Sequence, residues 1–206
     1  MKINEPKISS YEDAKIGGVE EYNNYRFTEN VEENITISDI TFDGCIFFNI
    51  DFSNIELDSI DLIDVIFENC DLSNKCFDEK MLSRVVFKNC KLLGTTFINS
   101  SLRDIKFCNC NLKYCNFANA KINNILFSES ILDESTFMET EIKNMELKEN
   151  KLYHTEFIKT KLKDVDFSNS DISNTIFDFY SLKGIIVDRF QCGHLVGMLG
   201  VQIKEE

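Results

Sequence analysis

An apolar residue recurs at every fifth position from Ile37 to Val187, which makes 31 positions without an exception. Only 43% of the chain is hydrophobic, so this regularity is not a chance pattern and indicates a structural repeat. A period of five fits neither the 3.6-residue period of a helix nor the two-residue period of an ordinary strand. The sequence therefore predicts a chain that bends once in every five residues.

Each repeat has a second selective position, two residues before the apolar centre. From Ile35 to Ile185, most of these positions hold Ile, Val, Cys, Ala, Ser, Thr or Met. Asn is common two residues after the centre, where it tolerates the left-handed backbone angles of a tight bend. We therefore expect two side chains in five to point inward and three to point outward. The exceptions at the second position are Lys75, Lys80, Asn150 and Tyr180.

These repeats resemble the signature of the pentapeptide-repeat family, which reads small, Asp or Asn, Leu or Phe, and two further residues. The resemblance covers about three quarters of the chain. It implies an all-β fold, a right-handed quadrilateral β-helix in which four pentapeptides form one square coil. The repeats that carry it most clearly are Ile50-Asp51-Phe52-Ser53-Asn54, Cys70-Asp71-Leu72-Ser73-Asn74, Cys115-Asn116-Phe117-Ala118-Asn119 and Val165-Asp166-Phe167-Ser168-Asn169.

The centres alternate between Leu or Ile and Phe from Leu62 to Leu182, with Leu147 as the one break. A superperiod of two pentapeptides is half of a four-pentapeptide coil. It predicts Phe on two opposite faces and Leu or Ile on the other two. Such volume-matched layers favour a single packing register.

Three segments follow from this pattern. Residues 35–187 form the repeat, and residues 1–34, which do not keep the five-residue period, are interpreted as an irregular acidic cap. A partner-binding arm is the alternative for that segment.

Within the repeat, Lys75 and Lys80 occupy two consecutive inward positions, and a buried unpaired lysine is costly. We expect a local bulge at residues 75–80 with both ammonium groups in solvent, or alternatively a functional loop.

The sequence of residues 188–206 predicts a C-terminal helix and a short strand that cover the last coil. Asp188 can cap a helix that runs to about Met198, and Val201–Ile203 has the pattern of a strand. The segment from Gln191 is similar to the C-terminal helix and strand of quinolone-resistance pentapeptide-repeat proteins. That resemblance implies a homodimer joined through this element. Its interface would comprise Phe190, His194, Met198, Leu199, Val201 and Ile203.

The net charge and the cysteine content limit which classes of function the protein can have. The formal net charge of −13 argues against direct binding to nucleic acid. The N-terminus lacks the apolar core of a signal peptide, and no apolar run reaches the roughly 20 residues that span a bilayer. We therefore predict a cytoplasmic protein without membrane contact, whose eight cysteines are reduced thiols.

Neither a metal site nor catalysis is predicted. Cys70, Cys90 and Cys110 recur at every fourth pentapeptide in the inward position, so they should form an interior column in which Cys acts as a small hydrophobe. The two histidines, His154 and His194, have no partner at motif spacing. We expect a protein that is not an enzyme and that has no cofactor.

The resemblance suggests a function in which an acidic, DNA-shaped rod binds a type II topoisomerase, DNA gyrase or topoisomerase IV, and confers fluoroquinolone resistance. One face of the predicted coil, centred on Ile37, Leu57 and every fourth centre after them, sums to −6. We call it the acidic face. The alternative is a structural or scaffold repeat protein that mediates protein–protein interaction. The predicted partner-binding residues of the acidic face are Asp39, Glu56, Asp58, Asp78, Glu79, Glu139, Glu156 and Asp178.

Overall fold

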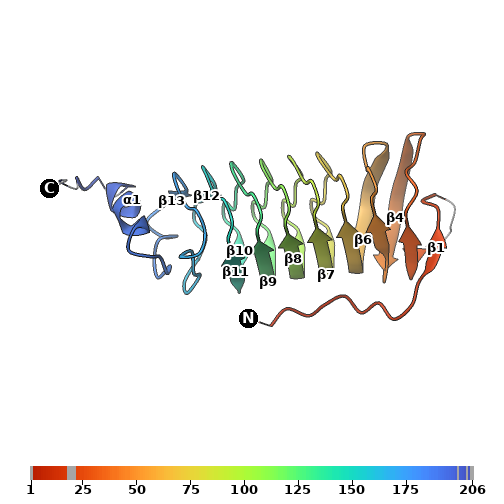
Figure 1. Ribbon diagram of the computed structural model, residues 1–206, viewed down its shortest axis with the longest axis horizontal. Coiled ribbons are helices and arrows are strands. Elements are labelled where there is room, and N and C mark those ends of the chain that lie inside the picture. Colours follow the sequence, from red (N-terminus) through yellow and green to blue (C-terminus); the bar gives the residue numbers. More distant parts are fainter. Residues whose placement is uncertain (1, 18–21, 199, 203, 205–206) are drawn as a thin grey trace.

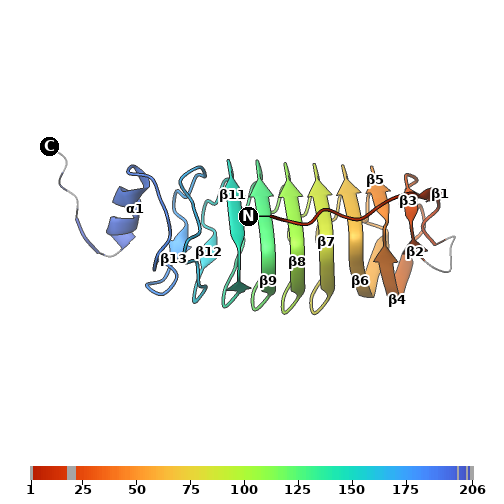
Figure 2. The same ribbon diagram turned by 90° about the horizontal axis from the view of Figure 1, so that it is seen from below.

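The chain forms a rod of stacked coils with a helix at its C-terminal end (Figures 1 and 2). This computed structural model describes residues 2–17, 22–198, 200–202 and 204. The elements are β1 (Glu12–Ala14), β2 (Tyr22–Asn23), β3 (Tyr25–Phe27), β4 (Ile35–Asp43), β5 (Ile46–Phe48), β6 (Ile55–Glu68), β7 (Met81–Lys88), β8 (Ser101–Cys108), β9 (Lys121–Ser128), β10 (Glu141–Ile142), β11 (Met145–Lys148), β12 (Glu156–Phe157), β13 (Ile176–Phe177) and α1 (Gln191–Met198).

Successive coils pair in parallel, and each residue pairs with the one four pentapeptides further along the chain. Leu62 pairs with Leu82, which pairs with Leu102, and Phe67 and Phe87 follow the same rule. Strands β1–β11 form one sheet of eleven strands, and β12 and β13 form a second, two-stranded sheet. The parallel β-solenoid with four pentapeptides per turn that the sequence predicts is confirmed.

The bends lie two residues after each centre, where the backbone takes left-handed angles. Asn69, Asn74, Glu79, Arg84 and Asn89 have φ values of 56°, 58°, 60°, 55° and 54°. Four such bends close one coil. The frequent Asn at this position is explained, because Asn adopts positive φ at less cost than most residues.

Stacked phenylalanine rings fill two opposite faces of the interior. The rings of Phe67, Phe87 and Phe107 lie 4.8–5.0 Å apart and within 8° of parallel. A second stack, which includes Phe97 and Phe117, meets the first edge to face across the axis at about 6 Å. These rings are 0–1% exposed, so each contributes a large part of the burial free energy of its coil.

The inward cysteines form the predicted column. The thiols of Cys70, Cys90 and Cys110 are buried, and each lies 3.4 Å from the backbone oxygen of a phenylalanine in the preceding coil. Ser130 and Asn150 continue the column and donate to the equivalent backbone oxygens of that phenylalanine column. The position therefore selects a small side chain that can donate one hydrogen bond.

The structure differs from the expectation for Lys75. Its side chain is 8% exposed, its Nζ donates to the backbone oxygen of Ile55 at 2.9 Å, and the Glu56 carboxylate lies 3.8 Å away. Lys80 is half-buried, and Glu79 between them has an ordinary corner conformation. The prediction of a bulge with both ammonium groups in solvent is therefore wrong, because the preceding coil supplies a hydrogen-bond acceptor for the buried ammonium of Lys75.

In the described residues of the N-terminal segment, 2–17 and 22–34, the chain forms the three short strands β1, β2 and β3. Strands β2 and β3 begin the solenoid, with Tyr22 paired with Phe42 and Phe27 paired with Phe47. Residues 2–11 run back along the outside of the rod from β1 towards β9 (Figures 1 and 2). We call this segment the strap.

Candidate functional site

The eight carboxylates predicted for partner binding lie on the acidic face in two groups. Glu56 and Asp58 stack above Thr36 and Ser38 of the preceding coil, and Asp39 and Glu79 occupy corners with φ of 56° and 60°. Between the two groups, the outward positions are neutral. They are Thr96, Ile98, Asn99, Asn116, Ala118 and Asn119. The face is therefore acidic at its ends and neutral in the middle.

The two groups also differ in whether their carboxylates form ion pairs and hydrogen bonds within the protein. In the C-terminal group, Glu139 forms an ion pair with Lys159 at 2.7 Å, and Asp178 accepts the backbone N–H groups of Lys159 and Ser181. Burial acts to raise the pKa of Asp178, but the hydrogen bonds from Ser181 and from the Lys159 backbone together outweigh it and hold that pKa below its usual value. These two carboxylates are committed to the protein itself.

The N-terminal group is more open to a partner. Asp39, Glu56, Asp58 and Glu79 are exposed. Glu56 approaches Lys75 only at 3.8 Å, whereas Asp78 is half-buried and accepts the backbone N–H of Ile98 at 2.8 Å. A binding surface on this face would therefore use the N-terminal group.

Charge is also separated along the rod, in addition to its separation between faces. Residues 39–79 carry eleven carboxylates and one lysine, a net charge of −10, and we call them the acidic end. Residues 80–164 carry fourteen basic and ten acidic side chains, a net charge of +4. This separation of charge can be found from the sequence alone, by adding the charges of the side chains along the chain. The carboxylates of the acidic end are Asp39, Asp43, Asp51, Glu56, Asp58, Asp61, Asp64, Glu68, Asp71, Asp78 and Glu79.

Two buried aspartates, Asp64 and Asp104, hold the strap. Both lie at the bend two residues after a Leu centre, in the column of bends that also contains Arg84 and Asn124. Asp64 accepts the backbone N–H of Lys7 at 2.8 Å and forms a bidentate pair with Arg84, with both distances 2.6 Å. Asp104, two coils on, accepts the side-chain amide of Asn4 at 2.8 Å. The rise of two coils, about 10 Å, matches the extended length of three residues, so the strap lies along the rod axis.

The C-terminal helix is capped as predicted. Asp188 Oδ1 accepts the backbone N–H groups of Phe190 and Gln191, and Gln191 Oε1 accepts that of Asp188, which is a reciprocal capping box. The Gln191 amide also donates to the backbone oxygens of Phe167 and Ser170. The helix therefore supplies hydrogen-bond donors for backbone oxygens that the last coil would leave unpaired.

No helix in the described part of the chain is long and apolar enough to cross a membrane.

The residues predicted for a dimer interface are partly exposed. Phe190 is 79% exposed, Val201 52% and Met198 37%, and His194 is half-buried with no hydrogen-bond partner for Nε2. Leu199 and Ile203 lie outside the described residues. The prediction of a strand at 201–203 is wrong as far as the structure describes it, because neither Val201 nor Gln202 lies in a strand.

Two buried thiols, Cys45 and Cys115, and the ring of His154 are not among the residues predicted to bind a partner. Burial raises the pKa of the Cys45 thiol to about 11 and raises that of Cys115 as well, so both thiols are un-ionised. His154 stacks on Tyr153 with the ring centres 4.1 Å apart. In the described residues, no three His, Cys, Asp or Glu side chains are grouped so that they could hold a metal ion.

Comparisons with known proteins agree with the repeat. The profile of the family described as "Pentapeptide repeat region" matches residues 60–137. No curated protein matches the sequence. Among solved structures, the chain is similar to full-length QnrB1, a plasmid-mediated fluoroquinolone resistance protein. Identity is 19% over 87% of this chain and 89% of that one, and the TM-score is 0.48. It is also similar to HetL, a pentapeptide repeat protein involved in heterocyst differentiation regulation from the cyanobacterium Nostoc. Identity there is 15% over 80% and 88% of the chains, with a TM-score of 0.41.

Proposed function

We propose that this chain, a parallel β-solenoid of five-residue repeats with a strongly acidic end, acts by binding another protein and not by catalysis. The surface that carries this function is the N-terminal group of carboxylates on the acidic face. The partner would present a basic surface. In its most specific form, the proposal is that this surface imitates duplex DNA and binds DNA gyrase or topoisomerase IV in the cytoplasm.

The observation that supports DNA mimicry is the local density of charge. Asp39, Glu56, Asp58, Asp78 and Glu79 lie on one face within two coil steps. Two steps rise about 10 Å, over which duplex DNA carries about six phosphates. Averaged over the whole rod, the face carries only about one carboxylate per coil, so the imitation is confined to the acidic end.

Gyrase is the first partner to test because a protein that binds a DNA-like row of charges is most simply a DNA-binding enzyme. The resemblance of the repeat and of residues 191–203 to the quinolone-resistance type points to the same enzyme. Binding at its DNA site would reduce supercoiling at high concentration. At lower concentration it would displace DNA from the drug-sensitive complex and so protect against a fluoroquinolone.

The same proposal includes a homodimer. Phe190, Met198 and Val201 leave apolar area exposed at the C-terminal end, and burial of such area drives association. A tail-to-tail dimer would place an acidic end at each tip of a longer rod. Sedimentation of a chain that stops after Val187 tests this part: the native chain should sediment as two protomers and the shortened chain as one.

The deciding experiment is a gyrase supercoiling assay with and without ciprofloxacin. The native protein should protect supercoiling at micromolar concentration and inhibit it in excess. The variant Asp39→Asn/Glu56→Gln/Asp58→Asn/Glu79→Gln should lose both effects. The control Glu129→Gln/Glu134→Gln/Glu141→Gln/Glu149→Gln removes as much charge from elsewhere on the rod and should keep both. No effect of the native protein on either reading would reject gyrase and leave a scaffold role.

A further inference from the structure

Parallel pairing between successive coils lapses at one place on the two sides that carry the long strands. Strands β10 and β11 pair with β9, and in the described part of the chain no later strand pairs with them. On the other two sides the stacking continues, with a parallel backbone bridge between Lys151 and Asp171. It resumes just after β11, where the backbone N–H of Glu149 donates to the backbone oxygen of Asn169 at 2.9 Å. The outer edge of β10 and β11 is therefore an unpaired strand edge inside the rod. We call the opening between this edge and residues 161–169 the seam.

Two of the sequence exceptions of the repeat, Leu147 and Tyr180, lie at the seam. Leu147 replaces the phenylalanine that would continue the stack after Phe127. Tyr180 is too large for the small inward position that the repeat assigns to it and is 56% exposed, and the neighbouring Ser181 is buried instead and accepts the backbone N–H of Thr160. Ile142, a centre residue, is only half-buried, whereas Ile122 one coil before is 2% exposed. A missing ring and a displaced tyrosine account for the opening in terms of packing.

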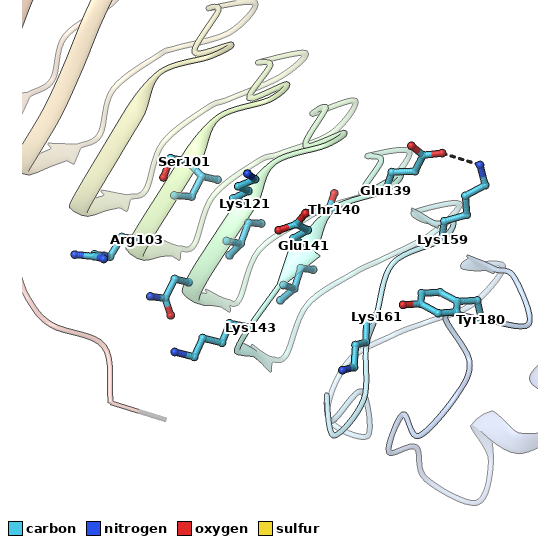
Figure 3. A pocket seen from close by; sticks show the side chains of 14 residues that line it. Ser101, Arg103, Lys121, Glu139, Thr140, Glu141, Lys143, Lys159, Lys161 and Tyr180 are labelled. Carbon is cyan, nitrogen blue, oxygen red and sulfur yellow. Dashed lines mark hydrogen bonds and ion pairs between the residues drawn. The ribbon is translucent and has the colours of Figure 1, made fainter.

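Two hollows lie along the seam, with volumes of about 470 and 500 Å³. Ile142, Lys143 and Lys161 line both, so the two are neighbouring parts of one groove. Figure 3 shows the first hollow, with Arg103 on β8 and Lys121 on β9 on one side and Lys161 on a later coil. Its size suits a short segment of extended polypeptide rather than a folded domain.

Basic side chains outnumber acidic ones in this groove, with seven Lys or Arg against five Asp or Glu in the linings of the two hollows together. The acids of the second hollow are Glu146, which pairs with Lys148, Asp164, which lies 4.0 Å from Lys163, and Asp166. Lys121, Lys143 and Lys161 form no ion pair in the described part of the structure. The two carboxylates of the first hollow are Glu139, which is paired with Lys159, and Glu141. In a chain of net charge −13, where other lysines on the rod pair with acids, this grouping favours an anionic ligand.

We propose that the seam is a docking site for an acidic, extended peptide segment of a partner protein. The peptide backbone would pair with the open edge of β10 and β11, as in strand addition to other exposed sheet edges. Its carboxylates would meet Lys121, Lys143 and Lys161. A polypeptide fits better than nucleic acid, because a strand edge offers hydrogen bonds at the spacing of a polypeptide backbone and the acidic rod repels a polyanion.

The strap shows that this side of the rod accepts an extended segment. Asn4 of the strap bonds to Asp104, and Glu5 forms an ion pair with Lys106 of β8. An acidic side chain of an extended segment is thus already paired with a lysine here. The corner that holds the strap continues along the rod to Asn144, which lines the groove. The seam therefore offers the next open cations beyond the end of the strap.

The test is fluorescence anisotropy of a labelled peptide of alternating Glu and Thr, about ten residues long. The native chain should bind it, and Lys143→Glu/Lys161→Glu should weaken binding at least about tenfold, since two charge-assisted contacts are lost. The control Lys151→Glu/Lys204→Glu changes the net charge equally outside the groove and should bind within about twofold of the native chain. Bound peptide should also slow hydrogen exchange of the amides in residues 141–148.

Three results would overturn the proposal. The first is equal weakening by both double variants, which would show only non-specific attraction. The second is binding without slower exchange in residues 141–148, which would exclude strand addition. The third is tighter binding of an oligothymidylate of about ten nucleotides than of the peptide, which would assign the groove to nucleic acid. Circular dichroism of each variant establishes that the fold is retained.

Discussion

The coils from β5 to β9 and the coils after β10 are built from the same five-residue unit, yet their interiors are not equally regular. In the first region the rings of Phe47, Phe67, Phe87, Phe107 and Phe127 stack 4.8–5.1 Å apart within 8° of parallel. In the second, Leu147 takes the place of a ring, and strands shorten to the two residues of β12 and β13. The comparison teaches that the pairing of neighbouring coils lapses where the ring stack is interrupted and Tyr180 is displaced.

The largest expected effect tests the ring stack. Phe107→Ala should destabilise the protein by about 3–5 kcal/mol, because it leaves a cavity between two fully packed coils. Leu147→Ala at the seam should destabilise it by only about 2 kcal/mol, since its surroundings are already open and can relax. Urea unfolding followed by circular dichroism measures both. Equal losses would show that the two regions are packed alike.

The second test concerns the regular region and its buried acid. Arg84→Ala leaves Asp64 buried without its bidentate partner and should cost about 2–3 kcal/mol. Lys91→Ala removes an exposed lysine 3.4 Å from Asp71 in the same region and should cost less than about 0.5 kcal/mol. The same unfolding experiment compares the two. A similar small loss for both would mean that burial of Asp64 adds nothing.

The third test follows from the pKa of Asp64. Burial acts to raise this pKa, but hydrogen bonds from Arg84 and the Lys7 amide outweigh it, so the folded value lies below the unfolded one. The carboxylate therefore stabilises the fold above about pH 4. That contribution falls away as the pH drops further, through the folded pKa. Asp64→Asn should be less stable than the native chain at pH 7, with a smaller difference near pH 2.

Other aspartates with lowered pKa values contribute equally to both proteins in this comparison. They are Asp71, Asp104, Asp166, Asp171 and Asp178. The difference between the two stability curves therefore isolates Asp64. A difference that stays constant from pH 7 to pH 2 would contradict the assignment.

The smallest expected effect is a gain in stability. Leu147→Phe should extend the ring stack across the seam and stabilise the protein by about 1 kcal/mol. It should also weaken binding of the acidic peptide at the groove, because pairing of β11 with the next coil removes the open edge. Thermal unfolding and the anisotropy assay give the two readings. A loss of stability would indicate overpacking and a seam set by something other than the missing ring.

Most of the solenoid could be predicted from the sequence because its rules repeat. The period of five, the Asn residues at the bends and the alternation of Phe with Leu or Ile each recur many times, so single exceptions do not hide them. Leu147 and Tyr180 were visible as exceptions. Their effect on pairing was not, because the pattern does not say whether a coil tolerates an exception or opens.

The strap and the burial of Lys75 could not be predicted for a different reason. Asn4 meets Asp104 although the two lie far apart in the sequence, and no period links them. The Lys75 ammonium finds its acceptor in the backbone of Ile55, and every residue type offers a backbone oxygen. The position of the acidic end, by contrast, needed only a sum along the chain. Which protein it meets is not encoded in any one motif.

The strap also fixes an order of assembly. Each turn of the solenoid can fold as soon as its predecessor is complete, so structure can grow from the N-terminal end as the polypeptide is synthesised. The strap is nevertheless placed later than the strands that directly follow it in the sequence, since Asn4 must wait until Asp104 has been made and stacked. During that interval the carboxylates of Asp64 and Asp104 face water, and docking of the strap then covers them.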